Sequence, residues 1–143
     1  CLWFPPHVET LGPAAKEMRE RAAAKGKEDF QITIGFEGWL SDEPNIREKH
    51  GHRWEREWSF YAEKGLSPDV EGETMLEQIE NMFLCLGNKQ KWIDRMGEMK
   101  EQVNPDWLCI RTRNPVNGDK FYPSRTECLE VIEAFGEILA EIR

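Results

Sequence analysis

Arg111 is the residue whose type and position most suggest binding chemistry, because it stands where a predicted strand ends. The apolar run of residues 107–110 is bounded by turn formers and is too short for a helix, which predicts a strand buried on both faces. A guanidinium that points inward from the end of such a strand can bind an anionic group. The alternative is that Arg111 and Arg113 both pair with acidic residues of neighbouring helices, and the sequence leaves both interpretations open.

Two further predicted strands end in side chains suited to binding. Residues 30–36 are rich in β-branched and aromatic residues, and Glu37 and Trp39 follow at the carboxyl end of this run. Trp3 lies in the apolar run of residues 1–4, which a Pro-Pro pair stops. In a parallel α/β sheet or barrel, ligands meet the loops at the carboxyl ends of the strands. We therefore expect these side chains to lie along one edge of a sheet.

Histidines and cysteines are weaker candidates for chemistry. His50 and His52 would share a face of an extended segment and could then chelate a metal. Their charged neighbours and the intervening glycine instead favour the solvated start of a helix, and we predict no metal site. The cysteines show neither a CxxC pair nor metal-ligand spacing, which favours buried free thiols over a disulfide or a catalytic role. They are Cys1, Cys85, Cys109 and Cys128.

Helical periodicity connects the predicted strands. The predicted helices are residues 13–25, 45–64, 73–86, 89–102 and 125–142. Pro13 suits the first position of the first helix, and Gly26 suits its left-handed cap. Within residues 73–86 the run FLCL also has the composition of a strand. The order of strands and helices predicts an α/β fold with parallel strands and right-handed crossovers.

Composition and charge restrict the classes of function. The chain has 143 residues, 39% of them hydrophobic and 32% charged, as in a soluble globular domain. A net charge of -8 argues against a nucleic-acid partner, because phosphate binding depends on clustered Lys and Arg. The apolar runs are far shorter than the ~20 residues of a membrane helix, so we predict a cytoplasmic protein with no membrane partner.

Several motifs in order resemble a known family. WFPP is followed by KGKEDFQITIGF, then by FLCLGNKQKWIDRMGEMKEQVNPDWLCIRTR, and then by AFGEILAEIR. This series resembles the carboxyl-terminal part of the bacterial luciferase-like monooxygenases, which are flavin- or deazaflavin-dependent oxidoreductases built on a (β/α)8 barrel. The chain departs from the family pattern in lacking Pro after Asn88 and in having Lys27 where Arg is usual.

The resemblance implies a partial TIM barrel of about the last three βα units, with parallel strands and outer helices. Residues 1–143 would then be one partial domain in which residues 45–72 are an inserted helix and loop. By resemblance the cofactor is FMN or a deazaflavin, the partner is a small-molecule substrate, and the cofactor-binding residues are Trp3, Glu37, Trp39 and Arg111. The catalytic residues would lie largely before Cys1, so the fragment alone is expected to be inactive.

A different class of function remains open, namely a stand-alone α/β interaction module without catalysis that uses the charged helix of residues 45–64 as its partner surface. Its aromatic stripe, Trp54, Trp58 and Tyr61, suits packing, and a lid over a planar ligand is the alternative. Under the barrel interpretation we expect strands 30–36 and 107–111 to be parallel neighbours. We also expect open sheet edges and exposed apolar residues, among them Ile32 and Ile34, to cause self-association.

Overall fold

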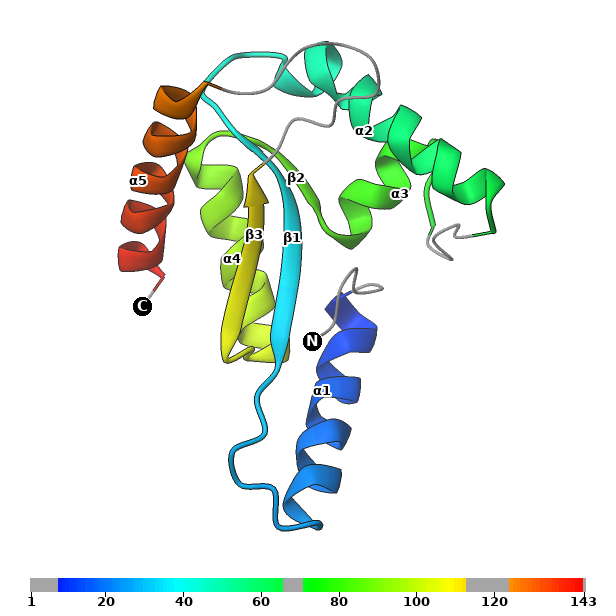
Figure 1. Ribbon diagram of the computed structural model, residues 1–143, viewed down its shortest axis with the longest axis vertical. Helices are drawn as coiled ribbons and strands as arrows, with labels where there is room; N and C mark the ends of the chain where they lie inside the picture. Colours follow the sequence, from blue (N-terminus) through cyan, green and yellow to red (C-terminus); the bar gives the residue numbers. More distant parts are fainter. Residues whose placement is uncertain (1–7, 66–70, 113–123, 143) are drawn as a thin grey trace.

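The computed structural model describes residues 8–65, 71–112 and 124–142. Within them, helices and strands alternate along the chain, except that α2 and α3 follow one another (Figure 1). The elements are α1 (Val8–Ala23), β1 (Thr33–Leu40), α2 (Ile46–Glu63), α3 (Met75–Met82), β2 (Leu84–Gly87), α4 (Lys89–Val103), β3 (Trp107–Thr112) and α5 (Arg125–Glu141). None of the helices in these ranges has the length and hydrophobicity that crossing a bilayer requires.

The strands form a parallel sheet in the order β2-β1-β3, with β1 at its centre. Thr33 is in register with Trp107, and Glu37 is in register with both Arg111 and Leu84. The predicted parallel adjacency of the second and last strands is therefore confirmed. A parallel sheet with helices around it is the architecture of a partial (β/α)8 barrel, as the sequence predicted.

β2 lies in a segment that was predicted as helix. The predicted helix over residues 73–86 is wrong from Phe83 onward, because α3 ends at Met82 and β2 begins at Leu84, within FLCL. A capping box of Thr74 and Glu77 starts α3, and this short helix leaves the following apolar residues free to pair with β1. The strand composition of FLCL was the correct signal.

Two other predicted boundaries differ from the structure. β1 begins at Thr33 and continues to Leu40, so Glu37 and Trp39 lie within the strand and not after it. α1 begins by Val8 and contains Pro13, so Pro13 does not open the helix as predicted. Gly26 has a φ of 68°, which confirms the predicted left-handed turn after α1.

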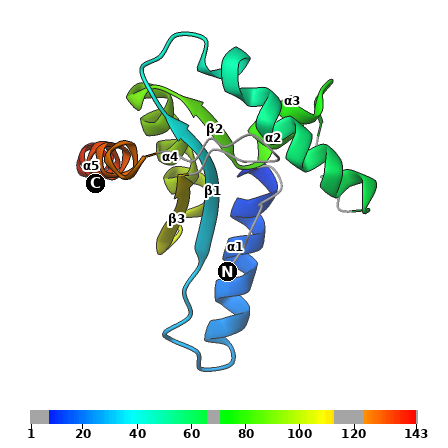
Figure 2. The same cartoon turned by 45° about the horizontal axis from the view of Figure 1, so that its top comes forward.

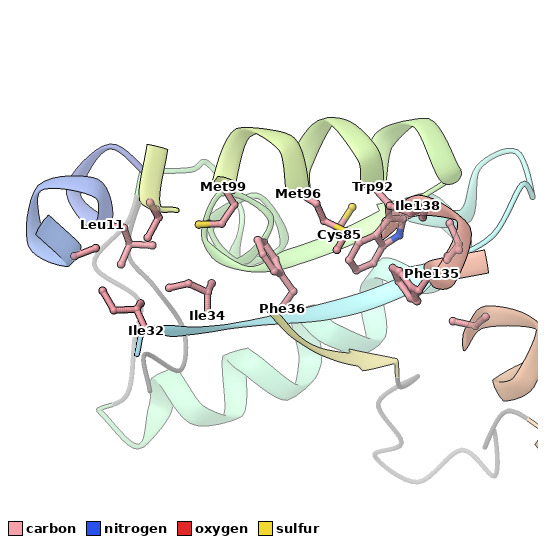
Figure 3. Packing of buried hydrophobic residues seen from close by; sticks show 14 residues of the cluster. Leu11, Ile32, Ile34, Phe36, Cys85, Trp92, Met96, Met99, Phe135 and Ile138 are labelled. Atoms are coloured by element: carbon pink, nitrogen blue, oxygen red, sulfur yellow. The ribbon is translucent and has the colours of Figure 1, made fainter. Parts of the chain in front are cut away.

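One hydrophobic core lies between the sheet and the helices α1, α4 and α5 (Figure 3). Ile34 and Phe36 point from β1 toward Met96 and Met99 of α4, and Ile32, just before β1, lies near Leu11 of α1. The expectation that Ile32 and Ile34 would be exposed inside the barrel is wrong, since both are buried beneath the helices. Side chains alternate along a strand, so Thr33, Gly35 and Glu37 take the opposite face.

A second core packs against the opposite face of β2. Leu84 and Leu86 point into it, whereas Cys85 between them belongs to the first core. The predicted aromatic stripe of α2 supplies Trp54 and Trp58, both buried. The Trp58 ring lies 5.0 Å from that of Phe83, measured between ring centroids. The stripe thus packs α2 and α3 onto the edge of the sheet.

Side-chain hydrogen bonds tie α1 to the turn that precedes β3. The Asp106 carboxylate accepts a 2.8 Å hydrogen bond from the Ile32 amide, and the Arg19 guanidinium lies 3.4 Å from the same oxygen. Arg19 also donates to the backbone carbonyls of Val103 and Asn104. The Ile32 bond, with Arg19 next, lowers the pKa of the Asp106 carboxyl. This group of contacts fixes where β1 and β3 start relative to each other.

Candidate functional site

The structure brings two of the predicted site residues together as an ion pair across neighbouring strands. Arg111 Nη2 lies 2.8 Å from Glu37 Oε1. The Glu37 side chain is only 1% exposed, whereas the Arg111 side chain is 34% exposed. Arg111 thus pairs with an acid of the adjacent strand, which neither interpretation of the sequence named, and its binding of an anionic group stays a prediction. The pair lies on the face of the sheet opposite α4.

Strand register explains why this pair forms. Glu37 and Arg111 are directly registered Cα partners, so their side chains leave the sheet on the same face. A buried carboxylate needs a partner, because an unpaired charge in a dry interior is strongly destabilised. The guanidinium supplies that partner and still keeps a third of its surface exposed. The buried Glu37 carboxylate therefore fixes the position of the guanidinium, whose exposed part can contact a ligand.

Trp39 lies two residues beyond Glu37 on the same strand, half-buried and packed against both cores. It lines a pocket of about 440 Å³ at the carboxyl end of β1. The other walls come from the residues that follow β1, from the first turn of α4 and from the middle of α5; they include Asp42, Lys89, Val131 and Glu137. Lys89 forms ion pairs with Glu137 and Glu141, at 3.2 and 2.7 Å. The end of β1 therefore borders a cavity on the side of α4 and α5, which neither Glu37 nor Arg111 lines, and the binding role of Trp39 stays a prediction.

The remaining candidates from the sequence are Trp3, Arg113 and the two histidines of residues 50–52. Trp3 and Arg113 lie outside the described residues. His50 and His52 both lie in α2, where residues two apart do not share a face, and His50 Nε2 is 3.6 Å from Glu43 Oε2. No group of three or more potential metal ligands occurs within the described ranges, and the absence of a metal site stays a prediction.

The cysteines are not all buried as predicted. Cys85 is buried in the first core, and burial raises the pKa of its thiol to about 12. Cys109 is exposed, because β3 is an edge strand and this residue faces away from α4 with Arg111. The predicted burial of β3 on both faces is wrong for the same reason, and Trp107 on the same face is 60% exposed. The exposure of this face follows from the place of β3 in the strand order, which the periodicity of the sequence does not encode.

Comparison with known proteins supports the fold. No family model matches the chain, and no curated protein matches it. Among solved structures, the crystal structure of long-chain alkane monooxygenase (LadA), a (β/α)8 barrel, matches with a TM-score of 0.60 and 16% sequence identity. The match covers 99% of this chain and 36% of that chain, so this chain spans about a third of the length of its structural neighbour. At this identity the likeness is one of fold.

Proposed function

We propose that this chain is part of a luciferase-like flavin-dependent oxidoreductase or monooxygenase that acts on a small-molecule substrate. The observation that carries the proposal is the Glu37–Arg111 pair, a positioned cation on the face of a parallel sheet opposite its outer helices. The fold likeness to a monooxygenase and the order of the sequence motifs point in the same direction.

The described residues fit one part of a flavin site. Arg111 would hold an anionic group of FMN or of a deazaflavin, because its guanidinium is partly exposed and Glu37 fixes its position. Trp39 would offer an aromatic wall near the strand end. The flavin, when bound, supplies the hydride and oxygen chemistry, while these residues supply orientation and charge. A closed barrel takes eight strands, so the proposal places the catalytic residues in a preceding part of the enzyme.

Flavin binding with and without the phosphate tests the assignment of Arg111. We would titrate FMN and riboflavin with the chain and follow the quenching of flavin fluorescence. One charge-assisted hydrogen bond is worth ~1.5–3 kcal/mol, so FMN should bind about tenfold more tightly than riboflavin, with both affinities weak. Arg111→Gln should remove the difference.

Arg21→Gln is the matched control, because Arg21 is an exposed arginine of α1 that pairs with Glu17. It should leave the FMN preference unchanged. Equal binding of FMN and riboflavin by the wild-type chain, or an equal loss of FMN affinity in both variants, would remove Arg111 from the site.

The nucleotide sequence upstream of Cys1 tests the broader proposal. An open frame with ~200 residues of βα pattern supports it, and a nearby start codon favours the non-catalytic module.

A further inference from the structure

One flank of α5 is apolar and exposed. Leu129, Ile132 and Leu139 recur at helical spacing along one side of the helix, and Ile132 is 60% exposed. The opposite flank faces α4, because Glu137 on that side pairs with Lys89. Figure 2 shows α5 at the outer end of the layer of helices, with α4 on one side and no described element on the other. The apolar flank of α5 therefore turns away from α4.

The core-facing residues of α4 and α5 match in spacing. They are Trp92, Met96, Met99 and Val103 in α4, and Val131, Phe135, Ile138 and Ile142 in α5. Aligned on this spacing, Ile93 of α4 corresponds to Ile132 of α5. Gly97 likewise corresponds to Gly136, which lies on the apolar flank between Ile132 and Leu139. The flank of α4 that contains Ile93 and Gly97 is thus the counterpart of the apolar flank of α5.

This flank of α4 faces the next helix of the layer, which is α5. Ile93 is half-buried and packs against the first core, and Gly97 borders a groove that Ile142 of α5 also lines. Lys100 on the same flank donates a 2.5 Å hydrogen bond to the Ile142 carbonyl. Successive βα units of a barrel repeat the same packing around its axis. We therefore expect the corresponding flank of α5 to face a further helix.

The proposed barrel determines which helix this is. Under the proposed function this chain supplies the last βα units, so α5 is the last helix of the outer ring. The ring is closed, so the helix that follows the last strand lies beside the helix that follows the first. The structural match covers 36% of the LadA chain, so a full-length barrel of that kind contains further βα units.

We propose that the apolar flank of α5 binds the helix of the first βα unit of a full-length enzyme and so closes the ring of outer helices. Leu139 stands where α4 has Lys100, so the bound helix offers apolar side chains to α5 and not a hydrogen-bond acceptor. The inference rests on the proposed function, because it takes α5 as the last helix of a barrel. In the 143-residue chain the flank is exposed and would contribute to the self-association that the sequence predicts.

Thiol labelling tests the contact in protein made from the whole open reading frame. Ile132→Cys places a thiol on the apolar flank, and Glu133→Cys places one on the exposed side of α5 opposite the core. In the full-length protein a maleimide should label Ile132→Cys about fivefold or more slowly than Glu133→Cys, because the two helices must separate first. In the 143-residue chain at low concentration both should react at similar rates, since both positions are exposed. Peptide mapping separates these thiols from the native cysteines.

A buried charge gives a second measurement. Ile132→Asp should lower the urea midpoint of the full-length protein more than that of the 143-residue chain, because only the full-length protein moves the carboxylate out of water. Ala140→Asp is the matched control, since Ala140 is exposed on the outward side of the same helix. It should lower the two midpoints equally.

Three results would overturn the proposal. Equal labelling of Ile132→Cys and Glu133→Cys in the full-length protein means that no helix covers the flank. An Ile132→Asp variant that lowers both midpoints equally means the same. A start codon close upstream of Cys1 removes the proposed first βα unit and overturns the proposed function as well.

The FMN preference assigned to Arg111, measured on the same full-length protein, separates this proposal from the proposed function. A protein that prefers FMN but leaves the apolar flank open refutes the helix contact alone. A protein with a protected flank and no preference for FMN refutes the flavin site alone.

Discussion

We expect Gly38→Ala, which adds a single methyl group, to destabilise the fold strongly. It sits in β1 opposite Cys85 of β2, and its φ is 156°. A Cβ added there would lie 1.8 Å from the Cys85 carbonyl oxygen and 2.9 Å from a ring carbon of Trp92. Ordinary contact begins near 3.4 Å, so the backbone of β2 would have to move by about 1.6 Å.

Such a movement breaks the pairing of the two strands. The Glu37 amide donates to Phe83 at 3.0 Å and the Ser41 amide donates to Gly87 at 3.0 Å, so the clash falls in the middle of the ladder. Overpacking costs ~1–3 kcal/mol, and a φ that disfavours side chains costs a similar amount. We expect Gly38→Ala to lower the free energy of unfolding by ~3 kcal/mol or more.

Urea unfolding followed by far-ultraviolet circular dichroism measures this loss, at several chain concentrations to separate folding from association. Gly97→Ala is the matched control, because nothing lies within 4 Å of the Cβ it would add in α4. It should stabilise the helix by ~0.5–1 kcal/mol. A Gly38→Ala chain within ~1 kcal/mol of wild type would refute the close approach of β1 and β2.

Asp106 and the cysteines give two further predictions, one on the pH dependence of stability and one on thiol labelling. The hydrogen bond from Ile32 and the neighbouring Arg19 lower the pKa of Asp106, so its stabilising effect is present above the unfolded value near ~3.9 and is lost as the pH falls through the lower folded pKa. Asp106→Asn should remove that part of the acid dependence, and an unchanged pH profile of urea unfolding would contradict it. The thiol of Cys109 is exposed while burial raises the pKa of Cys85 to about 12, so a thiol reagent should label Cys109 in the native chain and Cys85 only after unfolding. Peptide mapping distinguishes the two, and rapid native labelling of Cys85 would contradict its burial.

Sequence patterns predicted the elements well where one local signal dominated. α4 was predicted over residues 89–102 and begins at Lys89, after Asn88, whose side chain accepts a hydrogen bond from the Lys91 amide as a helix cap does. The aromatic stripe of α2 and the parallel pairing of β1 with β3 also follow from periodicity and topology. The missed strand β2 shows the limit, because a four-residue apolar run has no period of its own and only pairing with β1 decides its conformation.

The candidate site was predictable in part. Glu37 and Arg111 were chosen because they stand near strand ends, and the structure pairs them. Their pairing depends on a register that no sequence pattern specifies, since a shift of one residue would send Arg111 to the helix-covered face. Asp106 sets that register through the Ile32 amide, yet in the sequence it looks like an ordinary turn residue.

The central place of β1 has a consequence for how the chain is made. Its neighbour β3 is synthesised about 70 residues after β1 ends, which is several seconds at ~5–20 residues per second. During that interval Ile34 and Phe36 have neither β3 beside them nor α5 above them. Contacts between such distant parts of a sequence also form slowly once the chain is free. The nascent chain therefore passes through a period in which the apolar side chains of its central strand are accessible to chaperones and to neighbouring chains.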